Sequence, residues 1–166
     1  MLLSELKCVE KNINIEEYLK FDEEVKTKIL NKEWLGTFLS EDIKNILNND
    51  GKIWMFYLNG EVVCSMMYLP ASEKSLKKFN ISYLVEDVGE CGPIMVNPKY
   101  VGNGLQIQML NLLDGYCKSK QKKIILTTIH PDNIYSINNF VKLGYKYKNS
   151  FEFKRGKRDL YIKEIL

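Results

Sequence analysis

The stretch Val96-Asn-Pro-Lys-Tyr-Val-Gly-Asn-Gly-Leu-Gln-Ile-Gln-Met-Leu110 decides the fold, because it joins a strand to a helix through a glycine turn. The apolar run 94–96 indicates the end of a strand, and Pro98 lacks the N–H group that would continue a ladder. Gly102 and Gly104 then allow a sharp bend or a close approach to the backbone. Apolar side chains follow at helical spacing, namely Leu105, Met109, Leu112, Leu113 and Tyr116.

The beginning of this helix is predicted to bind an anion, in particular a phosphate. The first helical turn leaves N–H groups without partners, and the helix dipole adds partial positive charge there. Bare glycine backbone in front of that turn brings N–H groups close to phosphate oxygens. Two common phosphate motifs do not fit: a dinucleotide fingerprint needs Gly or Ala in place of Ile107, and a P-loop needs Lys in place of Leu105.

Length and composition predict one globular domain over residues 1–166. The hydrophobic fraction of 45% suits a folded core, and the net charge of +3 without an arginine-rich run suits a small anionic ligand and no nucleic acid. Because the cysteines lie far apart in the sequence, no metal site is expected; they are Cys8, Cys64, Cys91 and Cys117. Neither a signal-peptide pattern nor a membrane-spanning segment is present, so we expect a cytoplasmic protein without a membrane partner.

The first half of the chain is predicted to contain a strand, two helices and a β-hairpin. The strand is expected at residues 2–9 and the first helix at about 15–30. The second helix should begin at Ser40 and end at the stop signal 48–51, and the hairpin strands should be 53–58 and 61–69. Asn14 followed by Glu17 predicts a capped helix start. The dipeptide Asn59-Gly60 between two apolar runs is typical of a hairpin turn.

The second half is predicted to alternate helices and strands. A short basic helix is expected at 72–80, a helix at about 134–143 that Gly144 ends, and a closing hairpin of strands 145–153 and 159–165. The strand 124–129 should run parallel to the 94–96 strand, because a helix connects them. Gly92-Pro93 predicts a bulge or an unpaired strand side just before residue 94.

Two motifs occur in order along the chain, with a strand between them. They are Pro98-Lys-Tyr-Val-Gly-Asn-Gly-Leu-Gln106 and Asn133-x-x-Ser136-x-x-x-Phe140-x-x-x-Gly144-Tyr145. Together they resemble the pyrophosphate loop and the later helix of the GNAT superfamily of acyl-CoA-dependent N-acetyltransferases. The resemblance implies an α+β fold with a mixed, mostly antiparallel central sheet, flanked by helices, in which the parallel strands near 94 and 125 splay apart.

The resemblance also implies acetyl-CoA as the acyl donor. Its pyrophosphate would lie on N–H groups of the turn, at Val101, Gly102, Asn103, Gly104, Leu105 and Gln106. Its pantetheine arm would pair with the main chain of Ile94, Met95 and Val96. The second motif adds Asn133, Ser136 and Phe140 as cofactor-binding positions, with Asn133 facing the pantetheine end.

Four positions depart from the family pattern. The family usually has Arg or Gln at the position of Val101 and Gly or Ala at that of Gln106; many members have a general-acid Tyr at that of Phe140, and some a catalytic Glu at that of Thr128. Phenylalanine cannot donate a proton. Positioning of the reactants supplies roughly 7–11 kcal/mol, whereas a general acid or base supplies about 10²- to 10⁴-fold in rate. The activity is therefore still expected.

Other side chains are candidates for the missing proton transfers. Glu90 and Glu86 precede the 94–96 strand and could act as the general base, directly or through water; alternatively, both are exposed loop carboxylates. Tyr135 or Ser136 could replace the missing acid, unless Tyr135 packs or faces water. His130, the single histidine, is expected to be structural or solvent-facing.

We therefore predict an N-acetyltransferase that moves an acetyl group from acetyl-CoA to a primary amine of a small molecule or peptide. The amine would attack directly in a ternary complex, and the enzyme would be a monomer or a homodimer. One alternative is a non-catalytic acyl-CoA-binding sensor or structural domain. Another is the same fold with a different phosphorylated ligand. The sequence does not indicate which amine accepts the group.

Overall fold

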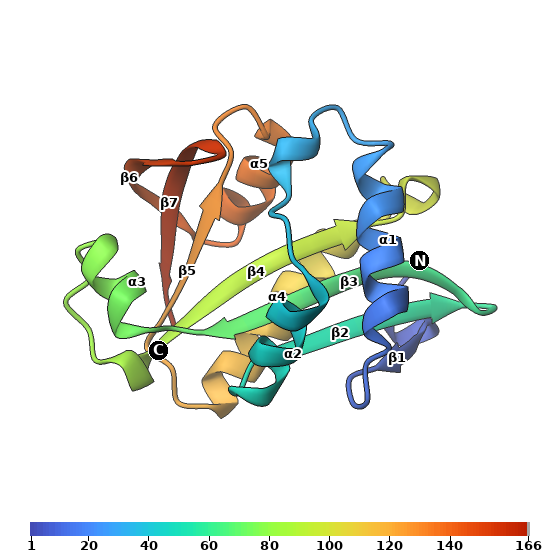
Figure 1. Cartoon of the computed structure of the whole chain (residues 1–166), viewed down its shortest axis with the longest axis horizontal. Helices are drawn as coiled ribbons and strands as arrows, with labels where there is room; N and C mark the ends of the chain where they lie inside the picture. The colour runs from blue at the N-terminus through green and yellow to red at the C-terminus, as the bar shows by residue number, and fades with distance from the viewer. Residues whose placement is uncertain (166) are drawn as a thin grey trace. The chain divides into compact units, whose positions relative to one another are not determined.

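The computed structural model describes residues 1–165 and contains one mixed sheet flanked by helices (Figure 1). The strands are β1 Lys7–Val9, β2 Lys52–Leu58, β3 Glu61–Pro70, β4 Val88–Val96, β5 Ile124–Ile129, β6 Lys146–Phe153 and β7 Gly156–Glu164. The helices are α1 Ile15–Lys26, α2 Ser40–Asn48, α3 Glu73–Lys78, α4 Leu105–Ser119 and α5 Ile134–Lys142, with 3₁₀ turns η1 Leu3–Glu5, η2 Lys32–Trp34, η3 Val85–Asp87 and η4 Pro98–Tyr100. No helix within residues 1–165 is both long and apolar enough to cross a membrane.

The sheet is mostly antiparallel, in the order β1-β2-β3-β4-β5-β7-β6. β2 pairs antiparallel with β1 and β3, and β7 pairs antiparallel with β5 and β6. β4 and β5 are parallel, with the run 88–90 opposite 124–126. The predicted fold class is thus confirmed, including a parallel pair connected by the helix that follows the glycine turn. The predicted splay of these strands beyond that register stays a prediction.

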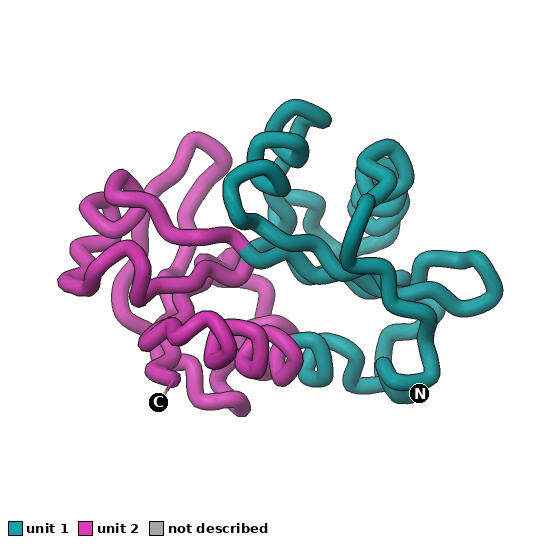
Figure 2. The backbone as a smooth tube through the Cα atoms, turned by 90° about the horizontal axis from the view of Figure 1, so that it is seen from below, with its two compact units in different colours: residues 1–68, 92–109 teal, residues 69–91, 110–166 magenta. Residues whose placement is uncertain are grey.

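The chain divides into two compact units, which Figure 2 colours separately. Unit 1 comprises Met1–Tyr68 and Gly92–Met109, and unit 2 comprises Leu69–Cys91 and Leu110–Leu166. β4 and α4 are both divided between the two units, with one part of each element in unit 1 and the other part in unit 2. The single domain predicted over 1–166 stays a prediction.

Unit 1 is built on the β2–β3 hairpin. The predicted Asn59-Gly60 turn is confirmed, with positive φ angles of 50° and 82° that match the twist of the strands. Helices α1 and α2 lie on one side of these strands, and the first turn of α4 lies on the other (Figures 1 and 2). Tyr18, Phe21 and Val25 form the buried stripe of α1. Each such side chain contributes about 1.5–3 kcal/mol when it leaves water.

Two helix starts follow the predicted chemistry. The Asn14 side chain accepts a hydrogen bond from the Glu17 N–H at 3.1 Å and caps α1. In α2, which begins at Ser40 as predicted, the Asp42 carboxylate accepts from the Leu39 N–H at 2.6 Å. Both bonds satisfy donors that the first helical turn leaves open.

Two predicted boundaries in unit 1 are wrong. The expected strand 2–9 is only β1, because the Leu3 N–H donates to the Gln108 side chain at 2.9 Å and not to a neighbouring strand. The expected helix 15–30 ends at Lys26, where the Thr27 hydroxyl turns back to the Glu24 carbonyl at 2.8 Å. In both places a side-chain hydrogen bond outweighs the apolar pattern that would have extended the element.

In unit 2, the two faces of the sheet differ in chemistry. On one face an apolar cluster joins the sheet residues Val88, Ile124, Leu126 and Leu160 to Leu76 of α3 and to Phe79, the residue that follows α3. Toward the other face, Lys163 of β7 forms an ion pair with Asp114 of α4. Alternation along β4 therefore places Val88 and Glu90 on the α3 face.

Two strand boundaries differ from prediction in the second half. β4 begins at Val88 and continues through Gly92-Pro93, so the strand is longer than the run at 94–96. A Cβ atom at Gly92 would lie 3.1 Å from the Met67 Cβ, so glycine there permits a close approach of β4 to β3. The last hairpin turns at Lys154-Arg155, and β7 starts earlier than predicted, at Gly156 with φ 106°.

Candidate functional site

The glycine turn of unit 1 is open and exposed. Gly102 and Gly104 have φ angles of 94° and 67°, which L-residues rarely adopt. A Cβ atom built on either glycine meets no atom within 4 Å. Val101 beside them is 68% exposed. The turn is therefore not filled by its own side chains on the side to which these Cβ atoms would point.

Asn97 fixes the start of the turn. Its N–H donates to the Val63 carbonyl at 2.8 Å, and its Nδ2 donates to the Val62 carbonyl at 3.2 Å. Its Oδ1 accepts from the Lys99 N–H at 3.1 Å, and its carbonyl accepts from the Tyr100 N–H at 2.8 Å. One buried side chain thus ties η4 to β3, so the loop is held before any ligand arrives.

Gln108 holds the other side of the turn, and sequence analysis missed it. Its Oε1 accepts from the Leu3 N–H at 2.9 Å, while its Nε2 lies 3.2 Å from the Met1 carbonyl and 3.3 Å from the Asn103 carbonyl. Asn103 Nδ2 in turn donates to the Tyr100 carbonyl at 2.9 Å. A half-buried glutamine one turn into a helix gives no sequence signal for a partner more than 100 residues away.

The turn delivers α4 with its N-terminus directed at the glycines. The first helical bond beyond the turn runs from the Gln108 N–H to the Gly104 carbonyl at 3.1 Å. Within the part of the chain that the structure describes, no main-chain bond uses the Gly102 or Gly104 N–H as donor. The 15 residues of α4 add the dipole that favours an anion at this end. The nine predicted cofactor positions at 94–96 and 101–106 thus belong to one continuous segment of unit 1.

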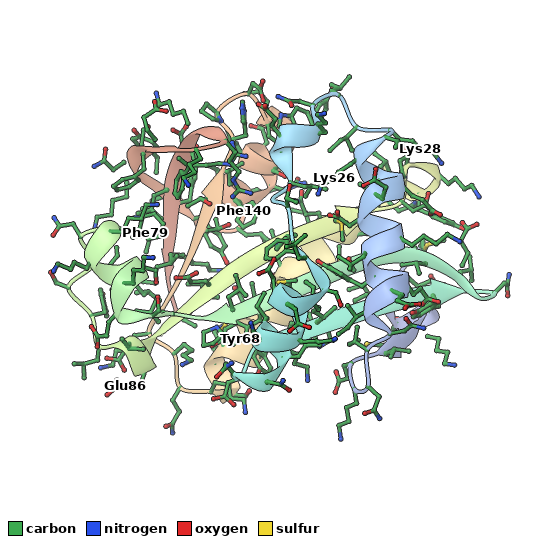
Figure 3. All side chains as sticks on the ribbon, in the orientation of Figure 1. Lys26, Lys28, Tyr68, Phe79, Glu86 and Phe140 are labelled. Atoms are coloured by element: carbon green, nitrogen blue, oxygen red, sulfur yellow. The ribbon has the colours of Figure 1, made fainter. Side chains whose placement is uncertain are left out.

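Glu90 and Glu86, both in unit 2, differ in their surroundings. Glu90 lies on β4 and accepts a hydrogen bond from the Ser75 hydroxyl of α3 at 2.8 Å. Burial raises the pKa of the Glu90 carboxyl, and the bond from Ser75 opposes that rise. Glu86 lies in η3 and is exposed; Figure 3 shows it at the edge of the molecule. Its carbonyl accepts from Lys122 Nζ at 2.9 Å.

The residues of the second motif have local roles in and beside α5. Asn133 caps the helix, because its Oδ1 accepts from the Ser136 N–H at 3.2 Å. Tyr135 is 70% exposed, as in the alternative that has it face water. Phe140 is buried with its ring edge against Tyr145, 4.9 Å between centroids. Nearby, His130 Nδ1 lies 2.6 Å from Asp132 Oδ1 within the same loop, which agrees with a structural role.

A model of the acetyltransferase (GNAT) family matches residues 14–145, most of the chain. The chain belongs to the GNAT family of acetyltransferases. The matched range includes the glycine turn, Glu90 and all of α5. A search of curated proteins finds no match.

Solved structures of GNAT proteins share this fold. An acetyltransferase of the GNAT family from Streptococcus pneumoniae is 17% identical, with a TM-score of 0.70 over 96% of this chain and 100% of that one. The ribosomal-protein-S18-alanine N-acetyltransferase from Escherichia coli is 10% identical, with a TM-score of 0.70 over 96% and 94%. The aminoglycoside acetyltransferase AAC(6′)-Ib in complex with coenzyme A is 14% identical, with a TM-score of 0.70 over 95% of each chain.

Proposed function

We propose that this GNAT protein transfers an acetyl group from acetyl-CoA to a primary amine of a small molecule or a peptide. The observation that carries the proposal is the open glycine turn in front of α4, whose N–H groups suit a diphosphate. Solved GNAT proteins similar in fold have been described with coenzyme A and with acetyl-CoA. One of them, AAC(6′)-Ib, is also described with the aminoglycoside ribostamycin, which supports an amine acceptor in general.

The turn would bind the diphosphate of the donor through the N–H groups of Val101 to Gln106. Glycine at 102 and 104 leaves room for phosphate oxygens, and Asn97 and Gln108 hold the loop in shape beforehand. The main chain of Ile94 to Val96 would pair with the pantetheine arm. N–H groups near Val96 would polarise the thioester carbonyl. This division of tasks needs no particular side chain at Val101.

Glu90 is the general base in this proposal. The amine nitrogen attacks the thioester carbonyl carbon, the new C–N bond forms, the C–S bond breaks, and Glu90 takes the proton that the nitrogen loses. Partial burial raises the pKa of the Glu90 carboxyl, which makes its carboxylate a stronger base than an exposed one. Glu86 is the weaker candidate because it is exposed and lies before the strand. Tyr135 remains the candidate for protonating the leaving thiolate.

Two assays test the proposal. Thermal shift with acetyl-CoA, NAD and ATP should show stabilisation by acetyl-CoA alone; stabilisation only by NAD or ATP would contradict acyl-CoA binding. Thiol release from acetyl-CoA with a panel of primary amines should then reveal turnover. Binding without turnover across polyamines, amino acids, aminoglycosides and peptide N-termini would favour the non-catalytic sensor, for which the phenylalanine at position 140 is the supporting observation.

A further inference from the structure

Two serines connect the Glu90 carboxylate to the surface of unit 2. Ser75 Oγ donates to Glu90 Oε1 at 2.8 Å, and Ser72 Oγ lies 3.2 Å from Ser75 Oγ. Ser72 is exposed at the start of α3, Ser75 is half-buried, and Glu90 lies beneath them on β4. The three side chains form a continuous row of oxygen atoms from solvent to the carboxylate.

The row is held in place by the packing of α3. Leu76 of α3 and the adjoining Phe79 are buried in the cluster that includes Val88, on the same face of β4 as Glu90. Ser72 caps α3 by accepting from the Ser75 N–H at 3.1 Å. The Ser75 hydroxyl takes part in the same cap, because it accepts from the Ser72 N–H at 3.1 Å. The capped and docked helix therefore holds this hydroxyl next to Glu90.

We propose that Ser75 and Ser72 form the path through which Glu90 exchanges its proton with solvent, and that Ser75 also orients the Glu90 carboxylate. This inference rests on the proposed function, in which Glu90 is the base. Ser75 and Ser72 are positioning residues, since neither is argued to touch substrate.

The proton balance of the path is simple. After Glu90 has taken a proton from the amine, its carboxyl donates that proton to Ser75 Oγ. Ser75 passes its own hydroxyl proton to Ser72 Oγ, and Ser72 releases one to water. Glu90 ends as a carboxylate, both serines end as neutral hydroxyls, and one proton has moved to solvent.

Ser75 is the polar group that acts most strongly on the Glu90 carboxyl. The ionisable side chains of α3 are all exposed; they are Glu73, Lys74, Lys77 and Lys78. Lys78 is directed to the last hairpin, with Nζ 3.8 Å from the centre of the Phe153 ring. On β5, the register partner of Glu90 is the apolar Leu126. Removing the Ser75 hydroxyl should therefore raise the Glu90 pKa further, because the bond that favours the charged form is lost.

Three substitutions separate the roles. Ser75→Ala should move the acid limb of the kcat/KM profile up by about one pH unit, the usual size for a lost hydrogen bond to a charged group, and Ser75→Thr should restore it. Ser72→Asn keeps a capping acceptor for α3 but cannot relay a proton. It should lower kcat while KM and the position of the acid limb stay unchanged. Carbon-13 NMR titration of the Glu90 carboxyl reads the Ser75 effect without any turnover.

The outcomes distinguish the two proposals. If Glu90→Gln is as active as the wild type, the assignment of Glu90 as base fails. If Glu90→Gln is inactive while Ser75→Ala leaves both the acid limb and the NMR titration unmoved, the base stands and the serine path is refuted. A Ser72→Asn variant with wild-type kcat would likewise overturn the path to solvent.

Discussion

Gly104→Asp should abolish coenzyme A binding while leaving the protein folded. Gly104 has φ 67°, and a Cβ atom there meets nothing within 4 Å, so the free protein bears only the backbone cost of that conformation. For a non-glycine residue this cost is about 1–2 kcal/mol. With a diphosphate in the turn, the new carboxylate would lie about 4 Å from a like charge, which costs about 4 kcal/mol at an effective dielectric constant of 20.

That repulsion corresponds to about a thousandfold loss of affinity. Isothermal titration calorimetry with coenzyme A measures it, and a thermal melt checks the fold. Gly104→Asn tests the backbone conformation and the added bulk without the charge, and should lose much less affinity. Gly115→Asp is the matched charge control, because Gly115 is exposed on α4 and has open space around its Cβ position. Equal affinities for Gly104→Asp and the wild type would refute the phosphate cradle.

Three further predictions follow from other contacts. Glu90→Gln should lower kcat/KM by about 10²- to 10⁴-fold and remove the acid limb of its pH profile. Burial raises the Glu90 pKa, so the folded state binds the Glu90 proton more tightly than the unfolded chain does. Protonated Glu90 therefore stabilises the fold below the unfolded pKa of about 4.3, and this stabilisation is lost as pH rises through the folded pKa. Chemical denaturation of Glu90→Gln across pH should lack this decline. Gln108→Leu removes three hydrogen bonds around the turn and should weaken coenzyme A binding by about tenfold, measured by calorimetry; unchanged affinity would show that the loop needs no such support. Asp114→Asn breaks the largely buried ion pair with Lys163 and should lower the free energy of unfolding by about 3–5 kcal/mol. Asp114→Leu combined with Lys163→Met should recover most of that loss, as measured by urea denaturation. An Asp114→Asn variant as stable as the wild type would show that the ion pair does not stabilise the fold.

Features coded by adjacent residues could be predicted from the sequence. The glycine turn, the start of α4 and the Asn14 cap depend on residues within a few positions of one another. The hairpin at Asn59-Gly60 is equally local. The parallel β4–β5 pair followed from the helix between the two strands. Short-range stereochemistry was sufficient for the turns, the cap and the helix start, and the rule for strand–helix–strand connections was sufficient for the parallel pair.

Contacts between distant residues could not be predicted in the same way. The late start of the first strand, at Lys7, depends on Gln108, which binds Leu3 from 105 residues away. Ser75 could be connected to Glu90 only after the face of β4 that meets α3 was known. The apolar stripe predicted for α4 was partly wrong for a related reason, since Leu112 is 38% exposed while Leu110 is buried. Helical spacing identifies a face, but the neighbours decide how wide that face is.

The central claim is that the main-chain N–H groups at 101–106 bind the diphosphate of an acyl-CoA. Amide proton–nitrogen NMR spectra recorded during titration with coenzyme A test it most directly, with phosphate-free pantetheine as the comparison. We expect the largest shifts at the Gly102, Asn103 and Gly104 amides with coenzyme A, and small shifts there with pantetheine. Unmoved amides at these three positions under saturating coenzyme A would contradict the account.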